Sequence, residues 1–484
     1  MLAAEKTVSH EPIARIIKRI SDARHQTDAL FGWVRQGSLY QRPIPERHRI
    51  IFYVGHLEAF DWNLLNDAVF GLKSSHPEFN RLFAFGIDPV GGGLPADQPS
   101  DWPPLDAIRE YVSSVRSALD KNLDQNLDQN LKKTSAELSH TRAGFPLSTL
   151  LNVAAEHRLM HAETLAYMLH QLPLDRKVQQ KVQQEVSRTN LPRLANRPVR
   201  HGLVAIPAGR VTLGLERNAE AFGWDNEFAA HTLKVPAFAI DRYKVTNRQY
   251  LEFIAAGGYE TRAWWNDEDW NWKTARGISC PLFWKKNGDR WLWRGMFTET
   301  PFTESPFPER LFDEVPLALD WPVYVSHAEA SAYARWAGKS LPTETEWQHA
   351  AYGTAEGNTR FYPWGNQAPD PGFNADSNTN FGNFDFQRWD PVPVNAFPEG
   401  QSAFGVHDML GNGWEWTSTV FAPFPGFEPF PFYRGYSADF FDGKHFVMKG
   451  GSPRTAACML RPTFRNWFQA HYQYVFAGFR CVSR

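Results

Sequence analysis

The chain has 484 residues with 51 basic and 53 acidic side chains, a net charge of −2, and this length predicts two or three domains. Near-neutral charge without a basic stripe excludes nucleic acid and anionic membrane surfaces as evident partners. Three scattered cysteines argue against a disulfide framework. The N-terminus has no apolar run, which argues against a signal peptide, and no apolar run reaches 18 residues, which argues against a membrane span. We therefore expect a cytoplasmic protein.

Four stretches of apolar residues at helical spacing occupy the first part of the chain, at about 12–30, 45–70, 105–138 and 148–172. Four long helices with connecting loops predict an antiparallel bundle over residues 10–175. The interior of such a bundle is a usual place for metal ligands, because side chains of facing helices converge there.

The fourth helical stretch carries an HxxxHxE motif, with His157, His161 and Glu163. Residues four apart on an α-helix project about 40° from one another, so the two imidazoles lie side by side and can share a metal ion. Glu163 lies roughly 240° round the helix from His157 and is the weaker candidate. His56, in the second stretch, is a third histidine from a facing helix. We therefore predict a metal site of three histidines.

Polar sequence and prolines at 176–200 predict a linker. From 201 to 484 the sequence changes to short strands, turns and aromatic-rich loops, with helical patches at 247–256 and 328–338. We expect an α+β domain with little regular structure.

Several segments of this second half resemble the formylglycine-generating-enzyme, or sulfatase-modifying-factor, fold, a C-type-lectin-related scaffold. They are Ile206-Pro-Ala-Gly209 with Leu213-Gly214, Val245-Thr246-Asn247, Trp336-Ala-Gly-Lys-Ser-Leu-Pro-Thr-Glu344 with Glu346-Trp347, Tyr362-Pro-Trp-Gly365, Gly411-Asn-Gly-Trp-Glu-Trp-Thr417, and Gly450-Gly-Ser452 followed by Phe479-Arg480. Formylglycine-generating enzymes bind copper through two cysteines four residues apart near the last segment. Here no second cysteine follows Cys458 at that spacing, which argues against that oxidase activity. A loop-bound Ca2+ is an open alternative, although no local carboxylate cluster requires it.

The first half resembles the DinB-like helical bundle, and the joined architecture resembles the ergothioneine-biosynthesis sulfoxide synthases and the related selenoneine synthases. The resemblance implies that His56, His157 and His161 hold a nonheme Fe(II) ion. It also implies that O2 is used to attach sulfur or selenium to the imidazole C2 of hercynine (Nα-trimethylhistidine). Three neutral imidazoles leave such an ion dicationic with up to three positions free.

The family's hercynine-binding segment resembles Phe464-Arg465-Asn466-Trp467. By that resemblance Asn466 hydrogen-bonds the betaine, and Trp467 offers an aromatic face to the trimethylammonium group. The alternative is that they are a turn amide and a core ring. Phe468 stands where the branch using γ-glutamylcysteine typically has Asp, which argues against that donor. The resemblance also implies a tyrosine as proton or electron donor, for which we favour Tyr433 over Tyr436.

Two regions resemble the selenoneine branch: residues 85–94, and residues 436–453 with 474–482. We therefore predict a selenoneine synthase with a selenosugar donor. The alternatives are an ergothioneine sulfoxide synthase using cysteine or another thiol, a DinB-type metal-dependent thiol transferase or hydrolase, and a non-catalytic ligand-binding module. The partners expected are small molecules; the sequence does not predict the oligomeric state.

Overall fold

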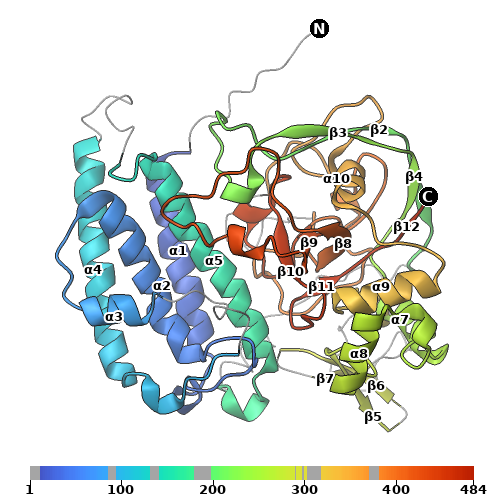
Figure 1. Ribbon diagram of the computed structural model, residues 1–484, viewed down its shortest axis with the longest axis horizontal. Helices are drawn as coiled ribbons and strands as arrows, with labels where there is room; N and C mark the ends of the chain where they lie inside the picture. The colour runs from blue at the N-terminus through green and yellow to red at the C-terminus, as the bar shows by residue number, and fades with distance from the viewer. Residues whose placement is uncertain are drawn as a thin grey trace. The chain divides into compact units, whose positions relative to one another are not determined.

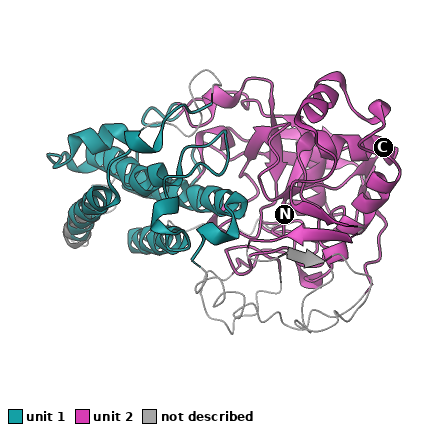
Figure 2. Ribbon diagram, turned by 90° about the horizontal axis from the view of Figure 1, so that it is seen from below, with its two compact units in different colours: residues 1–184, 218–222, 430–434 teal, residues 185–217, 223–429, 435–484 magenta. Residues whose placement is uncertain are grey.

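The structure is a computed structural model that describes residues 11–84, 94–130, 141–178, 198–288, 290–296, 299–301, 318–369 and 381–484. The chain divides into two compact units (Figure 2). Unit 1 comprises Met1–Gln184, Asn218–Phe222 and Phe430–Arg434; unit 2 comprises Glu185–Arg217, Gly223–Pro429 and Gly435–Arg484. Two short segments that follow residue 201 are therefore part of unit 1.

Unit 1 is helical (Figure 1). Its helices are α1 (Ile13–Phe31), α2 (Ile50–Leu65), α3 (Pro77–Leu82), α4 (Leu105–Asn130) and α5 (Leu147–Gln171). Helix α1 packs against α5, and α2 packs against both α4 and α5. This arrangement places the helix that carries His56 beside the helix that carries His157 and His161.

Helix α2 begins five residues later than its sequence pattern predicts. Arg49, the residue before Ile50, is extended at φ −63° and ψ 154°, and the prolines of 43–45 do not fit a helix interior. At its other end the chain continues as a π-helical turn over Asn66–Phe70, which Gly71 ends in the left-handed conformation at φ 65°. A left-handed residue after a helix is commonly glycine, because it has no Cβ to clash.

Unit 2 combines short strands with four helices in its described ranges. The strands are β1 (Leu203–Ile206), β2 (Gly209–Leu213), β3 (His231–Val235), β4 (Phe238–Asp241), β5 (Trp284–Asn287), β6 (Arg290–Arg294), β7 (Glu299–Pro301), β8 (Trp414–Val420), β9 (His445–Lys449), β10 (Asn466–Gln469), β11 (Ala477–Gly478) and β12 (Val482–Ser483). They form sheets in the orders β1-β4-β12, β10-β9-β8-β11, β2-β3 and β5-β6-β7. The helices are α7 (Asn247–Ala255), α8 (Asp267–Arg276), α9 (His327–Trp336) and α10 (Glu344–Tyr352).

Helices α7 and α9 coincide with the two predicted patches, and their starts follow from local chemistry. Ser326 accepts the backbone N–H of Glu329, and the Glu329 side chain accepts the backbone N–H of Ser326. This reciprocal capping satisfies amides that the first turn of a helix leaves unpaired. Helix α10 starts with the same box, at Thr343 and Glu346, and was not predicted. The mixed helical and α+β fold class is confirmed.

Several predictions fall on residues outside the described ranges. They are most of the linker at 176–200, nearly all of segment 85–94, and the end of the third helical stretch after Asn130. The predicted domain limits at 175 and 201 therefore stay predictions. In the described part of the chain, no helix has the length and apolar character needed to cross a membrane.

Candidate metal centre

His56, His157 and His161 converge inside unit 1, and one ring nitrogen from each lies within 4.8 Å of the others. The Nε2 atoms of His157 and His161 are 3.1 Å apart. The His56 ring centroid is 5.3 Å from that of His157 and 5.0 Å from that of His161. All three side chains are buried. Glu163 is also buried but is not part of this group, in agreement with its position round the helix.

The tautomer of His56 is fixed by the backbone. Its Nδ1 lies 2.7 Å from the carbonyl oxygen of Phe83, so Nδ1 carries the proton and donates it. Nε2 then keeps its lone pair, and it is buried without a hydrogen-bond partner among the described residues. A histidine held by a carbonyl through one nitrogen and left open at the other is the usual arrangement of a metal ligand.

Gly55 makes this arrangement possible. A Cβ at Gly55 would lie 2.5 Å from carbon atoms of the Phe83 ring. Real Cβ contacts are not that short, so any other residue would push Phe83 away and move its carbonyl from His56. The glycine that precedes the histidine therefore supports the tautomer of that histidine.

The three imidazoles are uncharged at neutral pH. Burial lowers the pKa of His56 to about 4. Burial, and then the neighbouring histidines, lower the pKa values of His157 and His161 well below their ordinary value. Neutral imidazoles are the form that binds metals. Two nitrogen ligands at right angles with bonds of about 2.1 Å would be about 3 Å apart, close to the separation of the two Nε2 atoms. The residues present thus fit a divalent transition metal ion.

A buried ion cluster lies next to the triad and joins the same two helices. Arg158 of α5 donates to Glu58 at 3.0 Å and to Asp61 at 2.7 Å, both of α2. All three side chains are 1% exposed. Arg116 of α4 donates to Glu58 at 2.9 Å. Because Arg158 follows His157 and Glu58 lies two residues after His56, the cluster fixes the register between the helices that carry the ligands.

The charges of the cluster are balanced against burial. Burial alone would raise the pKa of Glu58, but the guanidinium groups of Arg158 and Arg116 outweigh it and lower that pKa to about 2. For Asp61 burial prevails and raises the pKa of the carboxyl group. Removing one partner from such a cluster leaves a charge buried without compensation, which is costly.

A cavity of about 480 Å³ opens beside His56; we name it the triad cavity. It is lined by His56, Phe60, Asn63, Leu64, Asp67, Ala68, Ala84, Arg142, Ala143, Pro431, Phe432 and Tyr433. All of these residues belong to unit 1. Concave sites with a few converging polar groups are typical of small-molecule binding.

Of the two tyrosines considered for proton transfer, only Tyr433 lines this cavity. Its ring lies 5.1 Å from that of Phe60 and 6.1 Å from that of His157. Phe60 itself stacks on His157 at 3.4 Å. Tyr436 is a buried residue of unit 2 that stacks on Trp224 at 4.0 Å. The geometry therefore favours Tyr433 over Tyr436.

Asn466, Trp467 and Phe468 lie in strand β10 of unit 2. Successive side chains of a strand point to opposite faces, so Trp467 lies on the other face from Asn466 and Phe468. Trp467 stacks on Phe421 at 4.2 Å, and Phe468 stacks on Tyr472 at 4.9 Å. The three residues do not share one face, and their substrate roles stay predictions.

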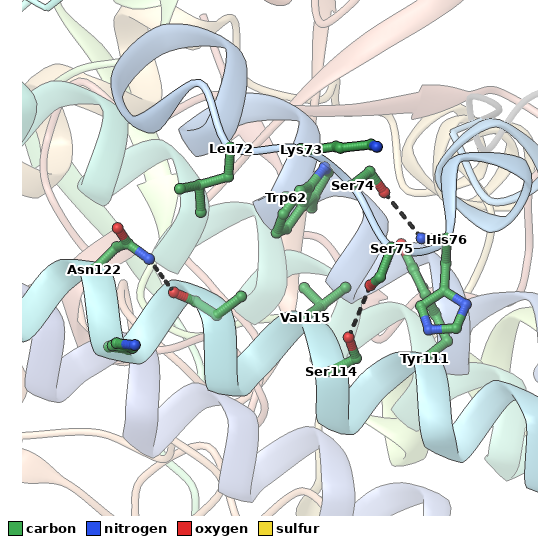
Figure 3. A pocket seen from close by; sticks show the side chains of 12 residues that line it. Trp62, Leu72, Lys73, Ser74, Ser75, His76, Tyr111, Ser114, Val115 and Asn122 are labelled. Atoms are coloured by element: carbon green, nitrogen blue, oxygen red, sulfur yellow. Dashed lines mark hydrogen bonds between the residues drawn. The ribbon is translucent and has the colours of Figure 1, made fainter.

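A second cavity in unit 1, of about 330 Å³, lies between α4 and the segment before α3 (Figure 3). Lys73, Ser75 and Ser114 are among its lining residues, and the two serine hydroxyls lie 3.0 Å apart. It shares no lining residue with the triad cavity. In the described ranges, the three histidines are the group of His, Cys, Asp or Glu side chains that converges closely enough for a metal ion. Ca2+ in unit 2 stays a prediction, and the described residues of that unit offer no candidate ligand set for it.

Sequence reasoning did not identify the Phe83 carbonyl or the ion cluster. A signal for the cluster is present in the sequence, because Glu58, Asp61 and Arg158 are charged residues inside otherwise apolar helical stretches. Charged residues are rarely fully buried unless they are paired. No comparable signal exists for a backbone carbonyl, because every residue has one.

Known families match both parts of the chain. Residues 19–165 match the DinB superfamily, and residues 189–484 match the sulfatase-modifying factor enzyme 1-like domain. The order of the two regions agrees with the order predicted from the motifs.

Among curated relatives, hercynine oxygenase of Mycolicibacterium smegmatis is 36% identical over 84% of this chain and 83% of its own length. Hercynine oxygenase of Mycobacterium tuberculosis is 40% identical over 55% of this chain and 57% of its own length. Ergothioneine biosynthesis protein 1 of Neurospora crassa is 28% identical over 92% of this chain and 55% of its own length. The chain thus spans little more than half the length of two of these relatives.

Proposed function

The chain belongs to the hercynine oxygenase family, in which a DinB-superfamily region precedes a sulfatase-modifying factor enzyme 1-like domain, and from that membership we propose that it is an O2-dependent enzyme acting on hercynine. The proposed reaction joins sulfur to the imidazole C2 of hercynine, with iron(II) held by His56, His157 and His161. The observation that carries the proposal is the buried triad of neutral imidazoles, of which His56 lines the triad cavity.

The reaction balances with O2 as the only oxidant. Hercynine loses the hydrogen on C2 and the donor loses its thiol hydrogen, as a carbon–sulfur bond forms. One oxygen atom of O2 ends on sulfur as a sulfoxide, and the other leaves as water with the two hydrogens. Four electrons reach O2, two from forming the carbon–sulfur bond and two from oxidising sulfur. When bound, iron(II) supplies the one-electron chemistry that lets O2 react with closed-shell substrates.

The residues of the chain hold and orient the reactants. Phe83 and the Arg158 cluster keep His56 facing the pair on α5. The Phe60 ring shields one face of His157. The Tyr433 hydroxyl is the group we propose to move a proton beside the triad, because its ring lies 6.1 Å from that of His157. Proton transfer by a positioned side chain typically raises the rate of a reaction by about 10²- to 10⁴-fold.

Sulfur is favoured over the selenium predicted from the sequence. The relatives above are named for hercynine oxygenation and ergothioneine biosynthesis, which supports the sulfoxide synthase alternative. One of the two segments that suggested selenium, 85–94, lies almost wholly outside the described residues. We therefore propose a thiol as the donor. A reducing, cytoplasmic setting is part of the proposal and agrees with three cysteines in thiol form.

The proposal is tested by product analysis. The protein is loaded anaerobically with iron(II), then mixed with O2, hercynine and an equimolar set of L-cysteine, γ-glutamylcysteine and a selenosugar, and the adducts are identified by mass spectrometry. We expect a sulfoxide adduct of hercynine from a thiol. A selenium adduct formed in preference would restore the selenoneine prediction, and no adduct from any donor would overturn the proposal as a whole.

A further inference from the structure

Asp97 joins three side chains beside the start of helix α2. Its carboxylate accepts from Nε of Arg49 at 3.0 Å and from Nε1 of Trp102 at 2.8 Å, and it also pairs with Arg42. The side chains of Asp97, Arg42 and Arg49 are only 19%, 17% and 12% exposed. We name these four residues the Asp97 cluster. None of them is a member of the triad or lines the triad cavity.

The Asp97 carboxylate is ionised at neutral pH and is held firmly. Burial would raise its pKa, but the Trp102 indole and the two guanidinium groups outweigh burial and lower that pKa. The Asp97 main-chain carbonyl also accepts from both arginines, at 2.8 Å from Arg49 and 3.3 Å from Arg42. Hydrogen bonds between charged partners are the stronger ones. An indole has a single N–H, so its bond to Asp97 fixes the orientation of the Trp102 ring.

The Trp102 ring stacks on Phe83, the residue whose carbonyl holds His56. The ring centroids of Trp102 and Phe83 are 5.9 Å apart, with 20° between the planes. Phe83 also stacks on Tyr111 of α4 at 6.0 Å and 21°, and the Tyr111 hydroxyl donates to Asn80 of α3 at 2.8 Å. Phe83 is completely buried. Its ring therefore contacts two rings that are each oriented by a hydrogen bond of their own.

Phe52 makes a second connection from Trp102 to His56. The Trp102 and Phe52 rings meet edge to face at 5.7 Å, and Phe52 stacks on the His56 ring at 4.7 Å with 22° between the planes. Phe52 and His56 lie four residues apart on α2, so their side chains share one face of the helix. Trp102 thus contacts both neighbours of the imidazole, the residue that accepts its Nδ1 proton and the residue that covers its ring.

We propose that Asp97 is a positioning residue of the metal centre, which acts through the Trp102 ring to hold the His56 imidazole in its ligating orientation. Trp102 transmits the position of Asp97 to Phe83 and Phe52, and these two set the tautomer and the ring plane of the histidine. The inference goes beyond the proposed function, because it concerns the binding of a divalent ion and involves no substrate. Loss of a group that bonds a ligand directly typically weakens metal binding about 10- to 100-fold. Asp97 acts through two intervening residues, so its loss should weaken binding less, about 5-fold.

The test measures the affinity of the metal-free protein for Co(II), whose visible absorption reports binding without turnover. Asp97→Ala removes every bond of the carboxylate, and the Kd for Co(II) should rise about 5-fold. Asp97→Asn keeps an oxygen that can accept the Trp102 N–H, so its Kd should lie between those of the wild type and Asp97→Ala. Trp102→Leu removes the ring that contacts Phe83 and should raise the Kd about 10-fold.

Asp101→Ala is the matched control. Asp101 lies in the same segment as Asp97, is exposed, and accepts the backbone N–H of Gln98 at 2.7 Å. The Trp102 indole bonds to Asp97 and not to Asp101. Asp101→Ala removes the same charge from the same segment, so the Kd for Co(II) should stay at the wild-type value. An equal rise in Asp101→Ala and Asp97→Ala would mean loss of order in the whole segment, and would overturn the inference.

A second measurement follows His56 itself in the protein without metal. With isotope-labelled histidine, the Nδ1–H of His56 should give a slowly exchanging proton signal in NMR spectra, identified by its absence in His56→Gln. Asp97→Ala should shift this signal and speed its exchange, and Asp101→Ala should do neither. A loss of stability in Asp97→Ala with no change in this signal or in the Kd would mean that the Asp97 cluster supports only the fold, and would overturn the inference. If the wild type binds no Co(II), the proposed function fails with the metal centre, and the His56 signal alone then decides the inference.

Discussion

Buried charged and titratable residues occur in both units, and they are used differently. In unit 2, Arg480 donates to Glu415 at 2.6 Å and to the His407 carbonyl at 2.9 Å. Lys244 lies 3.4 Å from Glu415 and donates to the Gly411 carbonyl at 3.1 Å. Burial would raise the pKa of Glu415, but Arg480 and Lys244 outweigh it and lower that pKa. These contacts join segments far apart in the sequence, among them strand β8, which carries Glu415.

In unit 1 the triad has buried nitrogen atoms that no described group satisfies, among them Nε2 of His56. The Arg158 cluster beside it is paired like the Glu415 cluster of unit 2. Buried polar groups are normally hydrogen-bonded. Single buried atoms without a partner also occur elsewhere, such as Nε2 of His327 in unit 2, but among the described residues three histidines converge within 4.8 Å of one another at the triad. Buried charge alone therefore does not identify a functional site, whereas the convergence of three buried neutral imidazoles does.

The largest effect is expected from removing a ligand. His161→Ala should lower iron(II) affinity by more than about 100-fold, above the range that loss of a supporting partner costs, because two imidazoles remain where three converge. Bound iron is measured by metal analysis after gel filtration. Glu163→Gln, two residues away on the same helix and outside the triad, should retain wild-type iron content. Equal amounts of bound iron in His161→Ala and Glu163→Gln would show that the triad is not the iron site.

Breaking either buried cluster should be costly, but only one should affect the metal. Arg158→Met removes the partner that Glu58 and Asp61 share. Arg480→Met removes the guanidinium paired with Glu415 and leaves it Lys244 alone. Each should destabilise the unit that contains it by about 3–5 kcal/mol in urea unfolding. Iron affinity should fall with Arg158→Met alone. A comparable fall in Arg480→Met would remove the distinction drawn between the two clusters.

A smaller effect is expected from the support of His56. Gly55→Ala places a methyl group against the Phe83 ring and displaces the carbonyl that holds Nδ1. Iron affinity should fall about 10-fold, the lower part of the range for lost supporting partners. Gly37→Ala is the control, because no atom lies within 4 Å of a Cβ there. Wild-type affinity in Gly55→Ala would show that the Phe83 carbonyl is not needed.

The smallest effect concerns pH and unit 2. His327 is buried against Phe446 at 3.7 Å, and burial lowers its pKa from 6.5 to about 4. Its contribution to stability is full above pH 6.5 and is lost as the pH falls toward and through about 4, because the unfolded state takes up the proton first. Between pH 6.5 and 5.5 the loss is about 1 kcal/mol. The variant His327→Phe should not show this loss when its free energy of unfolding is measured at the two pH values. If stability falls as steeply with pH in His327→Phe as in the wild type, His327 is not its source.

The sequence predicts local features well and long-range ones poorly. The pairing of His157 and His161 follows from helical geometry, since both residues lie on one turn of the same helix. The capping boxes Ser326–Glu329 and Thr343–Glu346 determine where α9 and α10 begin, although only α9 was predicted. Such features depend on residues three or four apart, where the backbone fixes the distance.

Contacts between distant segments required the structure. Tyr433 was favoured from resemblance, but nothing in the sequence indicates that Phe430–Arg434 belongs to the helical unit. The bond from His56 to the Phe83 carbonyl spans 27 residues, and backbone carbonyls leave no pattern in a sequence. Trp467 faces away from Asn466 and Phe468 because the three residues lie in strand β10. The sequence alone was also compatible with a turn at these residues.

The most direct test of the central claim is to exchange the metal. The protein is stripped of metal, reloaded anaerobically with one equivalent of iron(II) or zinc(II), and mixed with hercynine, L-cysteine and a measured amount of O2. We predict one O2 consumed per sulfoxide adduct with iron(II), and no adduct with zinc(II) because zinc has no redox chemistry. An adduct formed equally well with zinc(II), or no adduct and no O2 consumption with iron(II), would contradict an iron-dependent oxygenase.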